Sequence, residues 1–151
     1  MALPRLNEPE LDDLLRVQKF QDYRIDAEYT LDDGSHRGIY FRGRYEMQVF
    51  GDGQPPDKTS HMSVYGWAAP LVNASKPDNE WQTMERVIVG NKITVTLNGQ
   101  TVHDNTTLEA ITTNAVDSNE LEPGPIQLVG NDGKVWYRKV TITPIVDTRR
   151  Q

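Results

Sequence analysis

The sequence predicts an all-β protein built as an antiparallel β-sandwich. Apolar and polar side chains alternate in several stretches, Gly, Pro, Asn and Asp gather between those stretches, and no internal repeat or coiled-coil heptad is present. Alternation with a period of two is typical of a strand with one buried face. Many short strands separated by turns and long loops are typical of two packed antiparallel sheets. The 151 residues correspond to one ordinary domain.

The chain divides into three parts. Residues 1–13 are an acidic, proline-bearing segment, residues 14–146 are the predicted sandwich, and residues 147–151 are a polar tail. Before the first strand, residues 9–20 could hold one helical turn. The beginning of the chain, MALPRLNEPELDDLL, has no apolar core region and is therefore not a signal peptide. No apolar run approaches the roughly 20 residues that a membrane-spanning helix needs.

The first two predicted strands occupy residues 22–31 and 38–50, on either side of the turn-rich loop DDGSHRG. In the second of them, one face is apolar and the other polar. The apolar face carries Ile39, Phe41, Tyr45, Met47 and Val49, and the polar face carries Tyr40, Arg42, Arg44, Glu46 and Gln48. Pairing the two strands with Leu31 opposite Ile39 satisfies the alternation of both, because a slip by one residue would set apolar groups against charges.

This register offers a purely structural explanation of the polar face. It places Glu28 beside Arg42, Asp26 beside Arg44 and Arg24 beside Glu46. Cross-strand ion pairs of this kind contribute about 0.2–1 kcal/mol each, and little when exposed. The same side chains could instead bind a polar ligand, and the pattern leaves both interpretations open.

The remaining strands lie in the second half of the chain. The stretch WQTMERVIVGNKITVTLNGQTVHDN predicts three strands, separated at Gly90-Asn91 and at Asn98-Gly99. The Asn-Gly pair fits a two-residue hairpin turn, in which both central positions favour a positive φ. The stretch GPIQLVGNDGKVWYRKVTITPIV predicts two more strands, joined around residues 131–133. Residues 51–80 and 104–124 are predicted to be long loops.

Composition excludes several classes of function. The formal net charge of −6 and the pI of about 5.0 would repel a nucleic-acid backbone, and no basic stripe compensates. The absence of cysteine removes disulfides, thiolate metal sites and cysteine nucleophiles. We therefore expect neither nucleic acid nor a membrane among the partners.

Six segments occur in an order that resembles one bacterial family. They are KFQDYRIDAEY, GIYFRGRYEMQVF, YGWAAPLVNASKP, EWQTMERVIV, VTLNGQTVHDN and GPIQLVGNDGKVWYRKVTI. Across about residues 14–145, this ordered set resembles the 3-keto-disaccharide hydrolase domain family. The resemblance implies a concanavalin A-like (jelly-roll) sandwich, in which a concave sheet faces the carbohydrate.

The resemblance also implies a glycoside hydrolase that acts on a saccharide by elimination. A carbonyl at C3 of the sugar makes the C2 proton acidic, a base removes that proton, the aglycone leaves C1, and water then adds back. This chemistry needs a base suited to its task and a positive charge, hydrogen-bond donor or metal that stabilises the enolate.

Carried over by position, the resemblance implies a set of site residues. Glu46 would be the base or would accept a hydrogen bond from a substrate hydroxyl, and Arg42 would stabilise charge, since a guanidinium can donate twice. His103 would be a third catalytic residue. The implied substrate-binding residues are Arg44, Gln48, Tyr65, Trp67 and Arg138. The alternative for Glu46 is an ion pair with Arg24.

The chain departs from the family pattern at two places. Family members often have Leu-Gln-Asp-His-Gly before the last strand, where this chain has Leu-Val-Gly-Asn-Asp at residues 128–132, and often have glutamine at the position of Trp67. These differences favour a noncatalytic carbohydrate-binding module, whereas the retained face of Arg42, Glu46 and Gln48 favours an enzyme. Two-carboxylate hydrolysis, with Glu28 or Asp26 as the second acid, is a third hypothesis. A structural or partner-binding sandwich is also left open.

The sequence and the resemblance also give expectations about cofactors, partners and location. No cofactor is expected, although a bound calcium ion could take oxygen ligands from Asp52, Asp57 or Asp132. Family members usually begin with a further edge strand that residues 1–13 do not resemble. Because an uncovered edge exposes backbone hydrogen-bonding groups, either this segment or a partner chain in a homodimer would cover it. The resemblance suggests a secreted or periplasmic location.

Overall fold

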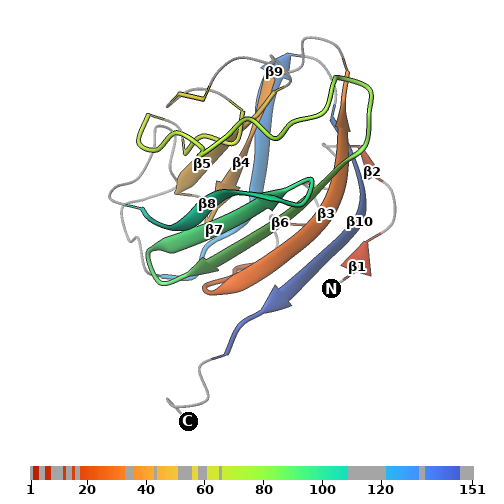
Figure 1. Cartoon of the computed structure of the whole chain (residues 1–151). Helices are drawn as coiled ribbons and strands as arrows, with labels where there is room; N and C mark the ends of the chain where they lie inside the picture. The colour runs from red at the N-terminus through yellow and green to blue at the C-terminus, as the bar shows by residue number, and fades with distance from the viewer. Residues whose placement is uncertain are drawn as a thin grey trace.

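The computed structural model places the strands in two antiparallel sheets (Figure 1). It describes residues 2–3, 6–7, 12, 15, 18–32, 36–42, 44–50, 56–57, 61–64, 66–108, 122–132 and 135–146. The strands are β1 (Ala2–Leu3), β2 (Leu6–Asn7), β3 (Tyr23–Leu31), β4 (His36–Phe41), β5 (Tyr45–Phe50), β6 (Gln82–Val89), β7 (Lys92–Leu97), β8 (Gln100–Thr107), β9 (Gln127–Asp132) and β10 (Val135–Pro144). The predicted all-β sandwich is thereby confirmed.

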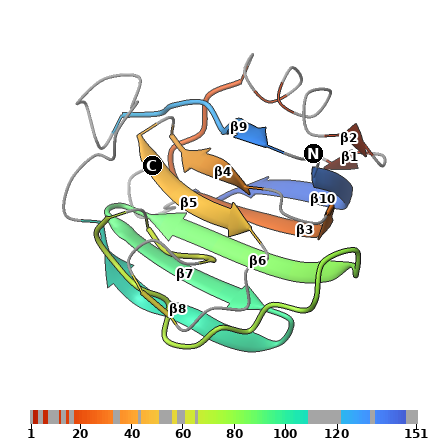
Figure 2. The ribbon, with the colours of Figure 1, turned by 90° about the horizontal axis from the view of Figure 1, so that it is seen from above.

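The two sheets differ in size. The large sheet has the order β1-β10-β3-β6-β7-β8, with β2 also paired to β10, and the small sheet has the order β5-β4-β9. Figure 2 shows them as separate layers, with the small sheet over the β10, β3 and β6 part of the large one. The chain crosses between layers from β3 to β4, from β5 to β6, from β8 to β9 and from β9 to β10.

The core lies between the layers, where the apolar faces of the strands meet. On β3 every second side chain is buried, from Tyr23 to Leu31. Ile39, Met47 and Val49 of the small sheet belong to the same buried cluster. The apolar face that the period-two alternation predicts for these strands is therefore the face that packs into the shared core.

The predicted pairing of the first two strands is wrong. β3 pairs with β10 and β6, whereas β4 lies in the other sheet and pairs with β5 and β9. Leu31 is opposite Val135 and Ile39 is opposite Met47. The alternation could not distinguish a hairpin partner from a strand across the sandwich, because both arrangements bury the same apolar faces.

The ion pairs expected from that register are therefore also wrong. Arg24 pairs with Asp26 on its own strand and with Glu85 on β6, rather than with Glu46. Glu28 pairs with Arg138 and Lys139 of β10. Glu28 and Asp26 belong to the large sheet, so neither is the second carboxylate on a strand beside Glu46 that two-carboxylate hydrolysis would require.

The predicted turn between β7 and β8 agrees with the structure better than the predicted strand pairing does. Asn98 and Gly99 both have positive φ, at 52° and 81°, as the hairpin between β7 and β8 requires. The single strand predicted over residues 38–50 is wrong: the structure has the hairpin of β4 and β5, because the chain turns between Phe41 and Arg44, where Arg44 N–H donates to the Phe41 carbonyl at 2.9 Å. The loop predicted from residue 104 begins later, since β8 continues to Thr107.

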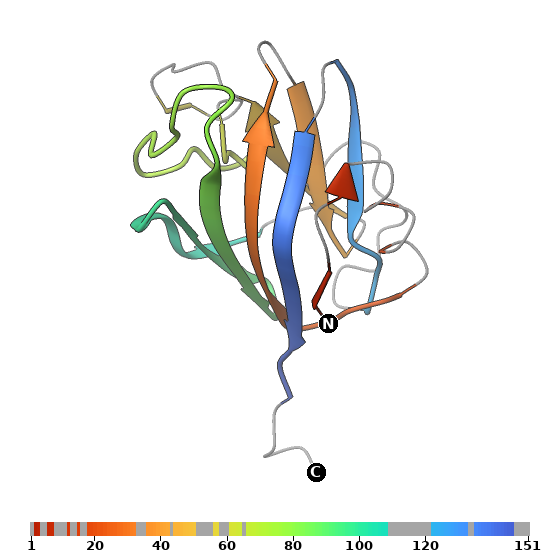
Figure 3. The same ribbon diagram turned by 90° about the vertical axis from the view of Figure 1, so that its right-hand side faces the viewer.

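The N-terminal segment contributes to the edge of the large sheet. Ala2 and Leu3 pair with β10 at Thr141 and Val140, and β2 pairs with the same strand nearer its beginning (Figure 3). The N-terminal segment and a partner chain were the two expected covers for this edge, and the structure shows the segment paired with β10.

Further along, Asp12 has helical backbone, and most of the predicted helical turn around it falls outside the described residues. The described part of the chain contains no helix long and apolar enough to cross a membrane.

Candidate functional site

The polar face of the small sheet is the side of β4 and β5 that points away from the core. The register places Tyr40 opposite Glu46 and Gly38 opposite Gln48. Their neighbours Ile39 and the other apolar side chains of both strands point into the core. Tyr40 and Gln48 are nevertheless only 2% and 3% exposed, and Glu46 is partly exposed. A largely buried polar face is costly unless its groups are paired or serve a ligand.

Glu46 is oriented by its two neighbours on β4. The Tyr40 hydroxyl donates a hydrogen bond to Glu46 Oε2 at 3.1 Å. Gly38 leaves room for the carboxylate, because a Cβ at this position would lie 2.5 Å from Glu46 Oε1. A partly exposed carboxylate that is oriented in this way can accept a proton from a substrate carbon or a hydrogen bond from a sugar hydroxyl.

The face continues beyond β5 onto residues 61–64. Met62 N–H donates to the Gln48 carbonyl at 2.9 Å, and Gln48 N–H donates to the Ser63 carbonyl at 3.1 Å. Two residues thus oppose one, which defines a β-bulge, and Met62 takes the left-handed conformation with φ 65°. Met47 forms a bridge with Val64, so the segment extends the small sheet at its β5 edge.

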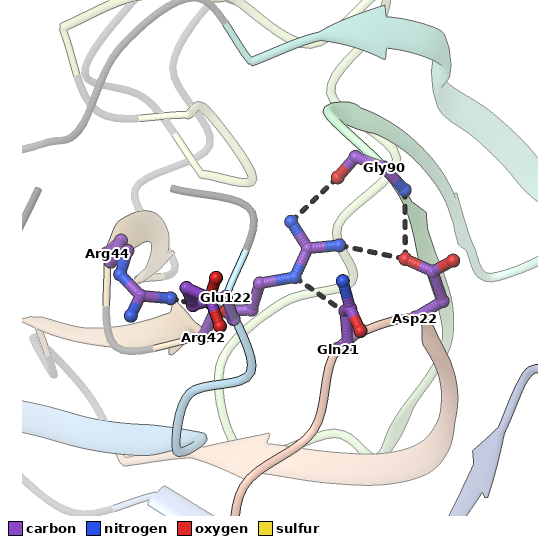
Figure 4. A network of polar contacts seen from close by, with 6 residues as sticks. All are labelled: Gln21, Asp22, Arg42, Arg44, Gly90 and Glu122. Atoms are coloured by element: carbon purple, nitrogen blue, oxygen red, sulfur yellow. Dashed lines mark hydrogen bonds and ion pairs between the residues drawn. The ribbon is translucent and has the colours of Figure 1, made fainter. Parts of the chain in front are cut away.

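Arg42 does not share the polar face with Glu46. Figure 4 shows its guanidinium directed to the loop before β3 and the turn after β6, where it donates to the carbonyls of Gln21 and Gly90, both at 2.7 Å. It also forms an ion pair with Asp22 at 3.1 Å. The side chain is fully buried, so it ties the β4–β5 turn to the large sheet.

Arg44 is also largely buried and bonds to the backbone. Its Nη1 donates to the Glu122 carbonyl at 2.7 Å, and the residue is 3% exposed (Figure 4). Of the four residues expected on one face, Glu46 and Gln48 share the outer face of β5, whereas Arg42 is directed to the large sheet. The reason is the turn at residues 42–44, which interrupts the alternation between β4 and β5.

His103 lies on the inner side of β8. Its Nε2–H donates to the Met62 carbonyl at 2.6 Å, and Nδ1 lies 3.4 Å from the Thr106 hydroxyl. Burial lowers the pKa of this imidazole, the bond to Met62 opposes that effect, and the nearby Arg86 charge lowers the pKa further. Since His103 contacts the bulge rather than Glu46, the geometry gives it a structural task next to the site.

The remaining predicted substrate-binding residues do not lie together. Trp67 is 45% exposed on the tight turn after Val64, which borders the β5 edge of the small sheet. Arg138 belongs to β10 of the large sheet, where its guanidinium lies 3.9 Å from the centre of the Trp81 ring and pairs with Glu28. Tyr65 falls outside the described residues.

Metal ligands do not gather in the described part of the chain. Among those residues, no three His, Asp or Glu side chains are placed to hold an ion. Of the aspartates considered for calcium, Asp52 is outside the described residues, and nothing is established for the side chain of Asp132. The calcium site stays an expectation.

Sequence reasoning missed two features of this region. Tyr40 was placed on the polar face with Glu46 but was not among the predicted site residues, although its shared parity was a signal for that role. Arg86 shares the inward parity of Met84 and Ile88 on β6, and a lone charge on an apolar face is a comparable signal. Burial lowers the pKa of Arg86, whose Nη2 lies 3.2 Å from the sulfur of Met62.

Comparisons with known proteins agree with this architecture. The family model of the 3-keto-alpha-glucoside-1,2-lyase-like domain matches residues 5–143. A search of curated proteins found no match.

Several solved structures share the fold. A Parabacteroides distasonis protein described provisionally as a glycosyl hydrolase is 22% identical with a TM-score of 0.72, covering 85% of this chain and 66% of its own. A second such protein from the same organism is 15% identical with a TM-score of 0.67, covering 86% and 75%. The carbohydrate-binding module CBM66 from Bacillus subtilis is 14% identical with a TM-score of 0.53, covering 83% and 77%. This chain therefore spans slightly less than two thirds of the first of these proteins.

Proposed function

The chain belongs to the 3-keto-alpha-glucoside-1,2-lyase-like domain family, and from that membership we propose that it cleaves a 3-keto-glucoside by elimination. Family membership makes it a carbohydrate-active domain. The proposal adds a reaction and assigns that reaction to the polar face of the small sheet.

The proposed reaction begins with removal of the C2 proton of the sugar. The electron pair of the C2–H bond forms an enolate with the C3 carbonyl, and collapse of the enolate forms a C1–C2 double bond while the aglycone leaves C1 with its oxygen. Addition of water across that double bond completes a net hydrolysis. A positioned base contributes about 10²–10⁴-fold to such a proton transfer.

Glu46 is the proposed base. It is the partly exposed carboxylate of the polar face, and the Tyr40 hydroxyl orients it through a hydrogen bond to Oε2. The Gln48 amide on the same face is the proposed neutral donor that would stabilise the enolate. Arg42, which the family resemblance suggested for this role, has its guanidinium bonded to Gln21, Asp22 and Gly90.

One observation carries the proposal. Glu46 is partly exposed beside Tyr40 and Gln48, which are almost completely buried, and Gly38 on the same face leaves space for its carboxylate. The alternative was an ion pair between Glu46 and Arg24. Arg24 instead pairs with Asp26 and Glu85, and a solvent-exposed ion pair would not need a glycine beside the carboxylate.

Product release from 3-keto-α-glucosides tests the proposal, with the matching unoxidised glucosides beside them. We expect the wild-type protein to release the aglycone from the keto sugars alone, because only the carbonyl acidifies C2. Glu46→Gln should lower the rate at least about 100-fold. Glu85→Gln, an exposed carboxylate on β6, is the matched control and should keep the rate. A Glu46→Gln variant as active as the control would contradict the assignment.

A noncatalytic sugar-binding module is the second candidate. Trp67 favours it, since an aromatic ring that is 45% exposed beside the β5 edge can stack on a sugar ring. The two candidates separate in one titration by calorimetry. Saturable binding of the keto or unoxidised sugars without release of aglycone indicates a module, whereas release indicates the enzyme.

A further inference from the structure

We propose that Asn98 is a site of spontaneous deamidation, which the folded protein suppresses and which, once it has occurred, releases the loop before β6. Its reactants are the protein's own backbone and water, so it goes beyond the sugar chemistry assigned to Glu46 and does not depend on it. The Asn98-Gly99 pair explains the turn between β7 and β8, but the turn alone gives no role to the Asn98 side chain.

The chemistry of the site follows from the glycine after Asn98. Glycine has no side chain to keep its backbone nitrogen from the preceding carboxamide, and asparagine is a thermolabile residue. The Gly99 nitrogen loses its proton and forms a bond with Cγ of Asn98, the bond from Cγ to Nδ2 breaks, and ammonia leaves with that proton. One water molecule then opens the succinimide ring to aspartate or isoaspartate. Gly99 is exposed, so water reaches the turn.

The folded protein holds the Asn98 carboxamide at three points. Oδ1 accepts a hydrogen bond from Thr83 N–H at 2.9 Å. Nδ2 donates to the Ala74 carbonyl at 2.9 Å and to Gln82 Oε1 at 3.1 Å. Because Thr83 N–H can only donate and the Ala74 carbonyl can only accept, the two ends of the carboxamide are fixed. Attack by Gly99 requires Cγ to turn away from these partners, so the fold opposes the reaction.

The backbone of the turn is held as well. Asn98 N–H donates to the Thr83 carbonyl at 2.7 Å, so both Asn98 and its side chain are bonded to the same residue of β6. The φ angles of Asn98 and Gly99, 52° and 81°, are those that a two-residue hairpin turn requires. Rotation of Asn98 towards the reactive geometry therefore needs local opening of the hairpin end.

The product no longer fits its surroundings. A carboxylate oxygen would replace Nδ2 and would face the Ala74 carbonyl and Gln82 Oε1, which are both acceptors. Ala74 and Gln82 are buried, so water cannot take the place of the lost donor. Turning the Gln82 amide would offer a donor but would break its hydrogen bond with Lys76 N–H at 2.9 Å. The loop over residues 73–76 is therefore released from the β7–β8 hairpin.

Peptide mass spectrometry of folded and guanidinium-unfolded protein, kept at the same mildly alkaline pH, tests the suppression. We expect Asn98 to convert at least about tenfold faster in the unfolded chain, because the folded protein must first break the three hydrogen bonds. Asn105 is the internal control: it also has a positive φ, at 50°, but Thr106 follows it, so it should convert slowly in both states. Equal rates at Asn98 in the two states would overturn the inference.

Asn98→Asp tests the release of the loop, with Asn105→Asp as the matched control. Both variants add one negative charge at a residue with positive φ, but Asn105 is exposed on β8. We expect Asn98→Asp to lower the denaturation midpoint and to speed hydrogen exchange at the Lys76 amide, and Asn105→Asp to change neither. Equal midpoints in the two variants would overturn the inference.

Asn98→Gly separates the turn from the carboxamide and serves if Asn98→Asp does not fold. Glycine suits the positive φ but provides none of the three side-chain hydrogen bonds. We expect a midpoint below that of the wild type and no mass increase at this position. A midpoint equal to that of the wild type would show that the carboxamide does not hold the loop. These experiments contain no sugar, so their failure is distinct from a failure of the proposed function.

Discussion

Side chains near the polar face divide into those that can meet a ligand and those that hold the backbone. Glu46, Tyr40 and Gln48 belong to the first group, since they lie on the outer face of the small sheet. Arg42 and His103 belong to the second, because each donates hydrogen bonds to backbone carbonyls in the interior. At the residue scale, charge or an imidazole ring is therefore a poor guide to catalysis here, and the hydrogen-bond partners decide.

The pH dependence of stability reports the structural role of His103. Burial lowers the pKa of the folded protein's His103 below its ordinary value of 6.5, whereas the unfolded chain binds the proton near that value. The unfolded state thus binds more protons as the pH falls, and stability is lost from about pH 6.5 down to the folded pKa. We expect urea denaturation to show a larger loss of stability between pH 7.5 and 5 in the wild type than in His103→Gln. Parallel losses in the two proteins would contradict this.

The elements place these side chains through two kinds of contact. Within the hairpin of β4 and β5, register alone sets Tyr40 against Glu46 and Gly38 against Gln48. Between the sheets, Arg42 joins the turn of that hairpin to the loop before β3 and the turn after β6. The first kind of contact orients the proposed base, and the second holds the hairpin on the large sheet.

Gly38→Ala tests the first kind of contact. The new methyl group would lie 2.5 Å from Glu46 Oε1 and would force the carboxylate aside, while the flexible side chain can move at little cost to folding. We expect turnover of a 3-keto-glucoside to fall about tenfold or more and the free energy of unfolding to change by about 1 kcal/mol or less. Turnover equal to that of wild type would show that Glu46 is not positioned as described.

Arg42→Met tests the second kind of contact. The substitution leaves Asp22 and two backbone carbonyls without their buried donor, and we expect it to lower the free energy of unfolding by about 2–4 kcal/mol. Arg24→Met is the control, because the Arg24 side chain is 43% exposed and its ion pairs should contribute about 0.5 kcal/mol or less. Equal effects in a chemical denaturation series would contradict the assigned role of Arg42.

The sequence predicted elements well where the signal was local. The alternation of β3 and the Asn98-Gly99 turn depend on neighbours within a few residues, and the structure confirms both. The partner of β3 could not be predicted, because an apolar face fits a hairpin and a strand across the core equally well. The parity of Glu46 and Gln48 correctly placed both on one face, whereas the destination of Arg42 depends on loops 20 and 48 residues away.

At the scale of the whole molecule, the order of the large sheet leaves β10 at the edge unless the N-terminal segment covers it. β1 pairs with β10 at Val140 and Thr141, and β2 pairs with it at Trp136 and Tyr137. An uncovered strand presents free backbone N–H and C=O groups to other chains. The N-terminal segment thus covers part of this edge, for which a partner chain in a homodimer was the alternative cover.

Deletion of residues 1–10 tests the role of that segment. We expect the shortened protein to associate with itself as its concentration rises, because the edge of β10 becomes available for pairing, and to unfold at lower denaturant. Light scattering across a range of concentrations, with the full chain in parallel, measures the first effect. A shortened protein that stays at the same size as the full chain at every concentration would contradict this.

The central claim is that Glu46, on the outer face of the small sheet, removes the C2 proton of a 3-keto-glucoside. Exchange of that proton in deuterated water, followed by NMR before any aglycone is released, measures the step itself. The account predicts rapid deuterium incorporation at C2 with the wild-type protein and with Glu85→Gln, and only the background rate with Glu46→Gln. Exchange by Glu46→Gln at the wild-type rate would contradict it.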